Sequence, residues 1–200
     1  MKPVGKLLRR TMPGFLKKLQ FWLGWNRIAF SLGCSVLVVA FADPSLWSLA
    51  AGSSIIIAGA ALRTWSSGYV KKNRELSMDG PYAYVRHPLY LGNFLLGLGF
   101  SIMANRWFLI IAFFVIFYAL YASVIHEEEQ TLHRTFGQAY KDYSKIVPPF
   151  IPRMGGGGPR TGRFTWALVR QHREPQTWLG ILAGICLLTA KMIWLHSMAG

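Results

Sequence analysis

The stretch GPYAYVRHPLYLGNF, residues 80–94, places Arg86, His87 and three Tyr residues beside the start of an apolar run. Proline is favoured at the first position of a helix, because its missing N–H would lack a partner there in any case. The stretch therefore predicts a helix that begins at Pro88, with His87 as its cap and Arg86 just outside. The free N–H groups of that helix end attract anions, and the two basic side chains add to the attraction. A positively charged topology anchor with an aromatic belt would explain the same residues without a ligand.

The composition around this stretch indicates a membrane protein. The chain has 200 residues, of which 52% are hydrophobic and 14% aromatic, and its mean hydropathy is +0.30. A soluble domain rarely reaches that balance. Five apolar segments stand out, at 28–42, 46–65, 88–104, 107–125 and 177–195. Two are short for a span of about 17–25 residues, and the connections at 43–45 and 105–106 are tiny. We therefore predict an all-α polytopic membrane protein with about five transmembrane helices in tight hairpins.

The distribution of basic residues predicts the orientation. Lys and Arg concentrate before residue 28, in the 66–87 connection and in the 126–176 region, where they number nineteen, whereas the opposite side holds only Arg106. Cytoplasmic loops carry such an excess, so the N terminus and the catalytic end are expected on the cytoplasmic side. Arg63 and Lys191 lie near span ends, where they are expected to snorkel toward the interface.

The same pattern divides the chain into four regions. We predict a basic interfacial arm over 1–27, a membrane core over 28–152, a Gly/Arg-rich cytosolic linker over 153–176 and a C-terminal transmembrane segment over 177–200. Four Arg residues alternate with apolar ones near the end of the linker, which suggests contact with anionic lipid headgroups. Simple anchoring of the last span explains these residues equally well. The four are Arg160, Arg163, Arg170 and Arg173.

A second stretch, YASVIHEEEQTLHRTFGQAYKDYSKIVPPFIP at 121–152, supplies the opposite charge. Glu127, Glu128 and Glu129 directly follow the fourth apolar segment, where carboxylates do not serve as positive-inside anchors. Phe136-Gly137 is typical of a helix stop. One or two of the three glutamates can belong to an ordinary solvated charge run, but ionisable groups at a membrane edge are functional candidates by default.

Both charged stretches are expected at the cytoplasmic mouth of one helical hairpin. A ligand with a carboxylate and an ammonium group, such as the amino-acid end of S-adenosylmethionine, would match these opposed poles. Four aromatic residues could cover an adenine or a sulfonium. They are Tyr82, Tyr84, Tyr90 and Phe136.

Four linked motifs, RHPLYLG (86–92), EEEQTL (127–132), FGQAYKDY (136–143) and VPPFIP (147–152), give the chain a family resemblance. In this order and spacing they resemble the isoprenylcysteine carboxyl methyltransferase and phospholipid N-methyltransferase superfamily over about residues 46–152. The resemblance implies S-adenosylmethionine as methyl donor and a lipid substrate that enters from the bilayer. Carried onto this chain, it implies cofactor contacts from His87, Tyr90, Gly92, Glu128 and Glu129, with Arg86 and Tyr140 as further candidates.

The motifs report the cofactor rather than the acceptor. An ionised carboxylate acceptor needs only orientation, whereas an amine acceptor must be neutral and needs a base. Glu127 and His126 are the candidates for that base. Because no base is evident, we predict O-methylation of a lipid-linked carboxylate, such as a prenylated cysteine, with Arg86 and Glu127 as catalytic residues. N-methylation of a phospholipid amine is the alternative.

Other classes fit less well. His126, Glu129 and His133 share a helix face that suits metal ligation, but five His residues are too few for a histidine-box di-iron site. An NADPH-dependent sterol reductase would favour Asn after the Arg-His pair, and a non-catalytic lipid-binding protein would need only the basic clusters and the Trp belts. The net charge is +14, but the basic residues lie between apolar runs rather than on a soluble face, which argues against a nucleic-acid-binding protein. We predict no metal, and the sequence specifies no oligomeric state.

Overall fold

A computed structural model of the chain describes residues 27–70, 75–155 and 162–199, and every element in these ranges is helical. The chain divides into two units, residues 1–40 and 41–200. Helix α2 (Arg27–Phe41) makes up most of the described part of the first unit. The basic arm predicted over 1–27 lies outside the described residues except for Arg27, as do Lys71, Lys72, Arg74 and Arg160.

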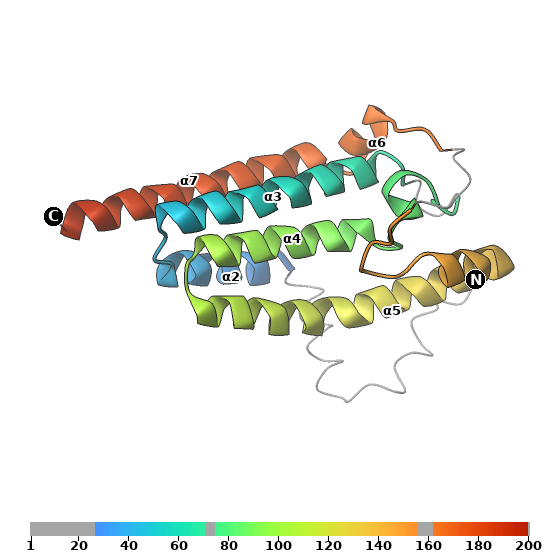
Figure 1. Ribbon diagram of the computed structural model, residues 1–200, viewed down its shortest axis with the longest axis horizontal. Helices are drawn as coiled ribbons and strands as arrows, with labels where there is room; N and C mark the ends of the chain where they lie inside the picture. The colour runs from blue at the N-terminus through green and yellow to red at the C-terminus, as the bar shows by residue number, and fades with distance from the viewer. Residues whose placement is uncertain (1–26, 71–74, 156–161, 200) are drawn as a thin grey trace. The chain divides into compact units, whose positions relative to one another are not determined.

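The second unit holds the remaining helices (Figure 1). They are α3 (Leu46–Ser67), η3 (Gly80–Ala83), α4 (Pro88–Met103), α5 (Trp107–Ile146), α6 (Trp166–Gln171) and α7 (Glu174–Ala199). Three described helices, α3, α5 and α7, are long and apolar enough to cross a membrane, and α4 is a shorter apolar helix. All five predicted apolar segments lie in helices, with α2 and α4 the short ones, which confirms the prediction of an all-α polytopic membrane protein.

Helices α3 and α4 approach closely through glycines. A Cβ atom added at Gly52 would lie 2.5 Å from the carbonyl oxygen of Gly99, and one added at Gly59 would lie 3.0 Å from that of Gly92. Small residues let helix backbones meet in lipid, where the hydrophobic effect does not drive helices together. The α3–α4 pair therefore has no room for a side chain at these crossings.

The turns before α3 and between α4 and α5 meet at one end of the second unit. The N–H of Asp43 donates to the carbonyl of Ala104 at 2.9 Å, and the side-chain amide of Asn105 donates to the carbonyl of Asp43 at 3.0 Å. Arg106 forms an ion pair with Asp43 at 3.2 Å. Because these turns share one end, the start of α4 and the charged half of α5 lie together at the other end.

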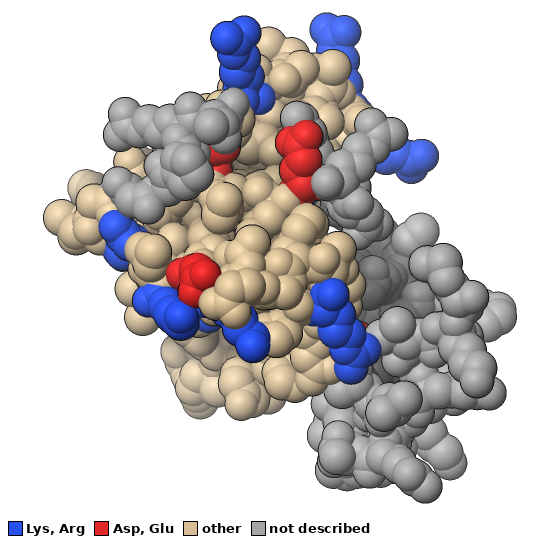
Figure 2. Space-filling model, turned by 90° about the vertical axis from the view of Figure 1, so that its right-hand side faces the viewer, with Lys and Arg blue, Asp and Glu red and all other residues tan. Residues whose placement is uncertain are grey.

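Helix α5 is interrupted at Gly137, whose φ of 52° lies in the left-handed region. The helix stop predicted there is confirmed, and a second helical stretch follows at 138–146. Tyr140, Tyr143 and Val147 form a buried cluster that packs against the first stretch through Leu132 and Phe136. Figure 2 views this end of the molecule, where basic and acidic side chains both appear on the surface.

The region after the core differs from the predicted linker. Residues 153–176 contain α6 and the first turn of α7, and α7 runs beside α3 (Figure 1). The prediction that Arg63 snorkels to the interface is wrong. Its side chain is only 16% exposed and forms an ion pair with Glu174 at 2.7 Å, because a buried charge partner satisfies the guanidinium without a path to water.

Candidate active site

The start of α4 matches the sequence prediction. Pro88 is the first helical residue and His87 is its N-cap, with φ −121° and ψ 60°. The imidazole of His87 makes no capping hydrogen bond. It is therefore available to other partners, although only 4% of the residue is exposed.

The 147–152 motif fixes the backbone just before α4. The N–H of Arg86 donates to the carbonyl of Pro148 at 2.9 Å, and that of His87 donates to the carbonyl of Pro149 at 3.2 Å. A third backbone hydrogen bond joins the same two segments: the N–H of Arg153 donates to the carbonyl of Tyr84 at 3.0 Å. From the sequence, this motif contributed only to the family resemblance. Its structural role is to hold Arg86 and His87 in place through backbone hydrogen bonds.

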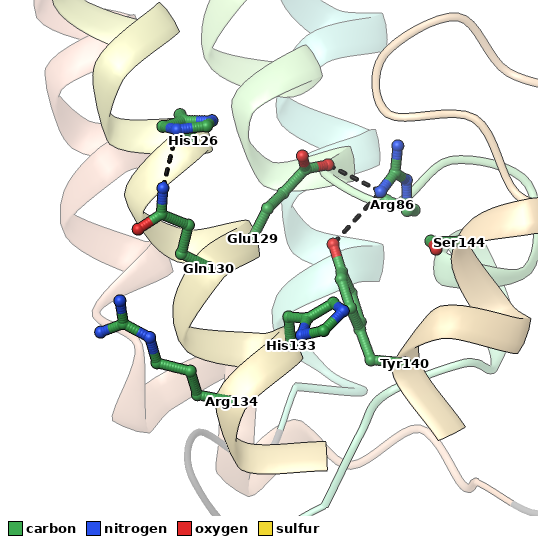
Figure 3. A pocket seen from close by; sticks show the side chains of 8 residues that line it. All are labelled: Arg86, His126, Glu129, Gln130, His133, Arg134, Tyr140 and Ser144. Carbon is green, nitrogen blue, oxygen red and sulfur yellow. Dashed lines mark hydrogen bonds and ion pairs between the residues drawn. The ribbon is translucent and has the colours of Figure 1, made fainter. Parts of the chain in front are cut away.

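The two opposed poles are in direct contact. Arg86 Nη1 lies 2.8 Å from Glu129 Oε1, and His87 Nε2 lies 3.2 Å from the same oxygen. His87 Nδ1 is 3.7 Å from Glu128 Oε2. Arg86 Nη1 also donates to the hydroxyl of Tyr140 at 3.2 Å, as the dashed lines in Figure 3 show. The structure thus brings together the Arg-His pair, two of the three glutamates and Tyr140.

Burial lowers the pKa of His87 below its usual range, although the neighbouring Glu128 and Glu129 oppose the shift. Its ordinary value is about 6.5, so the imidazole is neutral at pH 7. An ionised carboxylate only accepts hydrogen bonds, so the contact with Glu129 assigns the single proton to Nε2. Burial likewise raises the pKa of Tyr140, with Glu129 adding to the effect, so its phenol stays protonated.

A polar pocket of about 340 Å³ opens beside these residues. Its volume falls in the roughly 300–1,000 Å³ range of small-molecule sites. Figure 3 shows the lining side chains converging from both stretches of α5 and from the segment before α4. They are Arg86, His126, Glu129, Gln130, His133, Arg134, Tyr140 and Ser144. No cluster of three or more His, Cys, Asp or Glu side chains suited to a metal ion occurs in the described ranges.

Two other predicted cofactor residues have different surroundings. Tyr90 stacks on the imidazole of His87, with ring centroids 5.7 Å apart and an interplanar angle of 25°. Gly92 is buried in the α3–α4 interface, where an added Cβ would lie 2.4 Å from Arg63 Cγ. The structure therefore gives Gly92 a role in helix packing, and a cofactor contact from it stays a prediction.

The predicted catalytic Glu127 is exposed and does not line the pocket. Three of the four aromatic residues predicted to cover an adenine or a sulfonium pack against other parts of the protein. Tyr82 is buried, and its carbonyl accepts a hydrogen bond from the hydroxyl of Tyr143 at 2.7 Å. Phe136 packs against the Tyr140 cluster, and Tyr84 packs near Trp65 with centroids 6.4 Å apart. Of the four aromatic residues, Tyr90 alone contacts His87 through its ring in the described interactions.

Four residues of the pocket were not predicted as cofactor or catalytic residues: Gln130, Arg134, Ser144 and His133, the last considered only as a metal ligand. A signal existed for three of them. Positions 126, 130, 133 and 134 have the i, i+4, i+7 and i+8 spacing of one helix face. Ser144 lies beyond the Gly137 break, so helical spacing does not connect it to that face.

Comparison with known families and proteins agrees with the motifs. Residues 53–139 match the phospholipid methyltransferase family. A nickel-cobalt-cadmium resistance protein of Alcaligenes xylosoxydans xylosoxydans is 35% identical over 94 residues, which cover 46% of this chain and 44% of that protein. The protein-S-isoprenylcysteine O-methyltransferase of Schizosaccharomyces pombe is 33% identical over 100 residues, covering 50% and 42%. A cobalt-zinc-cadmium resistance protein of Cupriavidus metallidurans is 32% identical over 108 residues, covering 53% and 48%.

The matched segments thus span less than half the length of each of these three relatives. The matched region contains the first two motifs, the start of the third and most of the pocket residues, while the 147–152 motif lies beyond it. By its motifs and these matches, the chain is similar to the phospholipid methyltransferase family over residues 53–139 and to protein-S-isoprenylcysteine O-methyltransferases over about half of its length.

Proposed function

We propose that this chain is an S-adenosylmethionine-dependent integral membrane methyltransferase that acts on a lipid-linked acceptor at the cytoplasmic face. The proposed reaction is most like carboxyl O-methylation of a prenylated cysteine. One observation carries the proposal: a basic pole, Arg86 and His87, faces an acidic pole, Glu128 and Glu129, at the edge of a pocket of about 340 Å³.

The charged groups retain unused hydrogen-bonding capacity. Arg86 Nε is buried and has no hydrogen-bond partner among the described residues, although Nη1 of the same guanidinium makes two contacts. An anionic group such as the cofactor carboxylate would satisfy that donor. Glu128 has a 43% exposed side chain and approaches His87 only to 3.7 Å, so its oxygens can accept from an ammonium group. The residues present therefore fit the two ends of the amino-acid part of the cofactor.

When bound, S-adenosylmethionine supplies a methyl group already activated on a sulfonium. The protein then has to hold both reactants in line and exclude water. Arg86 and His87 orient the donor end, and the Tyr90 ring stacks on His87 and helps to hold it in place. A carboxylate acceptor is already ionised and needs no base. This agrees with the exposed position of Glu127, whose catalytic role stays a prediction.

The lipid environment fits an acceptor with an apolar chain. A lipid partitions into the bilayer with about 0.8 kcal/mol for each buried CH₂, which brings its headgroup to the depth of the site. The excess of basic residues on one side supports a location of that site at the cytoplasmic leaflet. Arg163, Arg170 and Arg173 are exposed near the start of α7, where they can meet anionic headgroups.

N-methylation of a phospholipid amine is the second candidate. The matched family carries the description phospholipid methyltransferase, and His126 lines the pocket. The side-chain amide nitrogen of Gln130 lies 2.8 Å from His126 Nε2. This contact orients the ring of His126 at the pocket, where an imidazole is the type of side chain that can act as a general base.

The test compares acceptors. Purified protein is incubated with labelled S-adenosylmethionine and either N-acetyl farnesylcysteine, phosphatidylethanolamine or short water-soluble analogues of each. We expect methylation of the farnesylated carboxylate and little of the soluble analogues. Methylation of the amine lipid alone would establish the second candidate. Equal turnover of the soluble analogues would refute access from the membrane, and absence of cofactor binding in calorimetry would refute the methyltransferase proposal itself.

A further inference from the structure

The C-terminal segment, which lies beyond the matched family region, is fixed to the end of α3. The N–H of Thr165 donates to the carbonyl of Gly68 at 3.0 Å. Within α7, the indole N–H of Trp178 donates to the hydroxyl of Thr64 at 3.0 Å. These contacts anchor the segment, but they do not lead toward the candidate site.

One contact of α7 is of a different kind. Glu174, in its first turn, has a side chain that is 3% exposed and pairs with Arg63 of α3 at 2.7 Å. Glu174 Oε2 and Arg63 Nε have no hydrogen-bond partner in the described part of the chain. Each charge therefore depends on the single contact with the other and on neutral neighbours, since a buried charge without a partner is strongly unfavourable.

The guanidinium of Arg63 also fixes a side chain of α4. Its Nη1 donates to Asn93 Oδ1. Arginine has only donors, so Asn93 must turn its oxygen toward Arg63 and its NH₂ group away. That NH₂ group donates to the hydroxyl of Tyr121 at 3.1 Å. Arg63 therefore determines the amide orientation of Asn93 and, through it, the position of the Tyr121 hydroxyl.

Tyr121 connects this network to the candidate site. Its ring meets Tyr90 edge to face, with centroids 5.4 Å apart, and stacks on Phe117 at 4.3 Å. Tyr90 in turn stacks on His87, whose Nε2 faces Glu129. A continuous series of packed and hydrogen-bonded side chains thus runs from the start of α7 to the basic pole.

We propose that Glu174 is a positioning residue for the methyl-transfer site: through Arg63, Asn93 and Tyr121 it holds the ring of Tyr90 against His87. The inference rests on the proposed function only for its catalytic meaning, because the effect on His87 exists without any cofactor. It gives α7 a role in the site although no residue of α7 lines the pocket.

The experiment follows His87 directly. Its imidazole is titrated by NMR in the parent, in Glu174→Gln and in Trp178→Phe, using ¹⁵N-labelled histidine and a His87→Gln sample for assignment. The ring is packed by Tyr90 and faces Arg86, Glu128 and Glu129, and burial dominates its pKa. Loosening the Tyr90 stack admits water, so Glu174→Gln is expected to raise the pKa of His87 toward its ordinary value. Trp178→Phe removes an anchor of the same helix outside the network and is expected to leave the pKa unchanged.

Cofactor affinity provides the second readout. Side chains that couple through such contacts change binding by about 2- to 30-fold, so Glu174→Gln should weaken S-adenosylmethionine binding within that range while Trp178→Phe does not. An unchanged His87 titration in Glu174→Gln, or equal changes in both variants, would overturn the inference, because anchoring alone would then account for α7. If the parent binds no cofactor, the proposed function fails and the NMR result still decides the inference.

A second variant tests the inference if Glu174→Gln does not fold. Replacing both members of a buried ion pair by apolar residues is often tolerated where removing one is not. If Glu174→Gln does not fold, the double variant Arg63→Met, Glu174→Met takes its place. It also removes the contact with Asn93, so it should raise the pKa of His87, and an unchanged titration would again contradict the inference.

Discussion

Substitution of Glu129 by Gln isolates the charge of the acidic pole, because the two side chains have nearly the same shape. Glu129 Oε1 lies 2.8 Å from Arg86 Nη1 and 3.2 Å from His87 Nε2. A hydrogen bond to a charged group contributes about 1.5–3 kcal/mol, against about 0.5–1.5 kcal/mol for a neutral one. The contact from the neutral His87 therefore loses about 1–1.5 kcal/mol, whereas the contact from Arg86 keeps a hydrogen bond to a charged group and loses only its ion-pair attraction.

Both contacts matter for cofactor binding, because Glu129 orients Arg86 and His87 and, with Glu128, forms the acidic pole proposed to face the cofactor ammonium. Together they amount to about 1–3 kcal/mol, or roughly a 5- to 150-fold rise in Kd. The side chain of Glu129 is 27% exposed, so solvent screening favours the lower end of that range. The assay is isothermal titration of S-adenosylmethionine into protein in nanodiscs at fixed ionic strength.

Asp142 provides the matched control on the second stretch of α5. It is exposed, pairs with Lys145 at 2.9 Å and is not among the residues that line the pocket. Solvent screens exposed pairs of this kind, so they contribute little, and Asp142→Asn should bind cofactor like the parent. If Glu129→Gln binds within about twofold of the parent, a difference below about 0.5 kcal/mol, the assignment of the acidic pole is refuted.

Three further predictions concern packing, pH and topology. Gly99→Val places side-chain atoms against the Gly52 carbonyl, 2.8 Å from the position of a Cβ, and should destabilise by about 1–3 kcal/mol or more, measured as a lower Tm. The folded chain binds the His87 proton more weakly than the unfolded chain, so the free energy of unfolding should fall as pH drops below about 6.5, and His87→Gln should flatten that slope. A Cys placed at Arg106 should react with impermeant reagents only from outside, and labelling from the cytoplasm would contradict the orientation.

Local signals in the sequence predicted much of the fold. Pro88 after His87 predicted a helix start, Gly137 predicted a helix stop, and the short connections predicted hairpin turns, because each depends on a backbone preference of one or two residues. The Arg86–Glu129 encounter was also predictable, since both residues border the same hairpin. These expectations needed no knowledge of how the helices are rotated.

The features that could not be predicted from the sequence depend on how each helix is rotated about its axis and on contacts between residues far apart in the chain. Consecutive helical residues point about 100° apart, so Glu127, Glu128 and Glu129 cannot all face the pocket. Which of them turns inward is set by how α5 packs, and the structure leaves Glu127 outside. Likewise, nothing near Arg63 in sequence identifies Glu174, which lies 111 residues later. The snorkelling of Arg63 was therefore predicted only from its position near the end of a span.

The separation between Arg63 and Glu174 has a consequence for the order of membrane insertion. Asn93 follows Arg63 by 30 residues, but Glu174 follows by 111. At about 5–20 residues per second, a growing chain holds α3 in the bilayer for roughly 6–22 s before its acidic partner is synthesised. An Arg within a spanning helix costs up to about 3.5 kcal/mol at the bilayer centre. Early assembly therefore relies on the glycine-lined contact with α4, and a chain truncated before Glu174 should be degraded faster in a pulse-chase experiment.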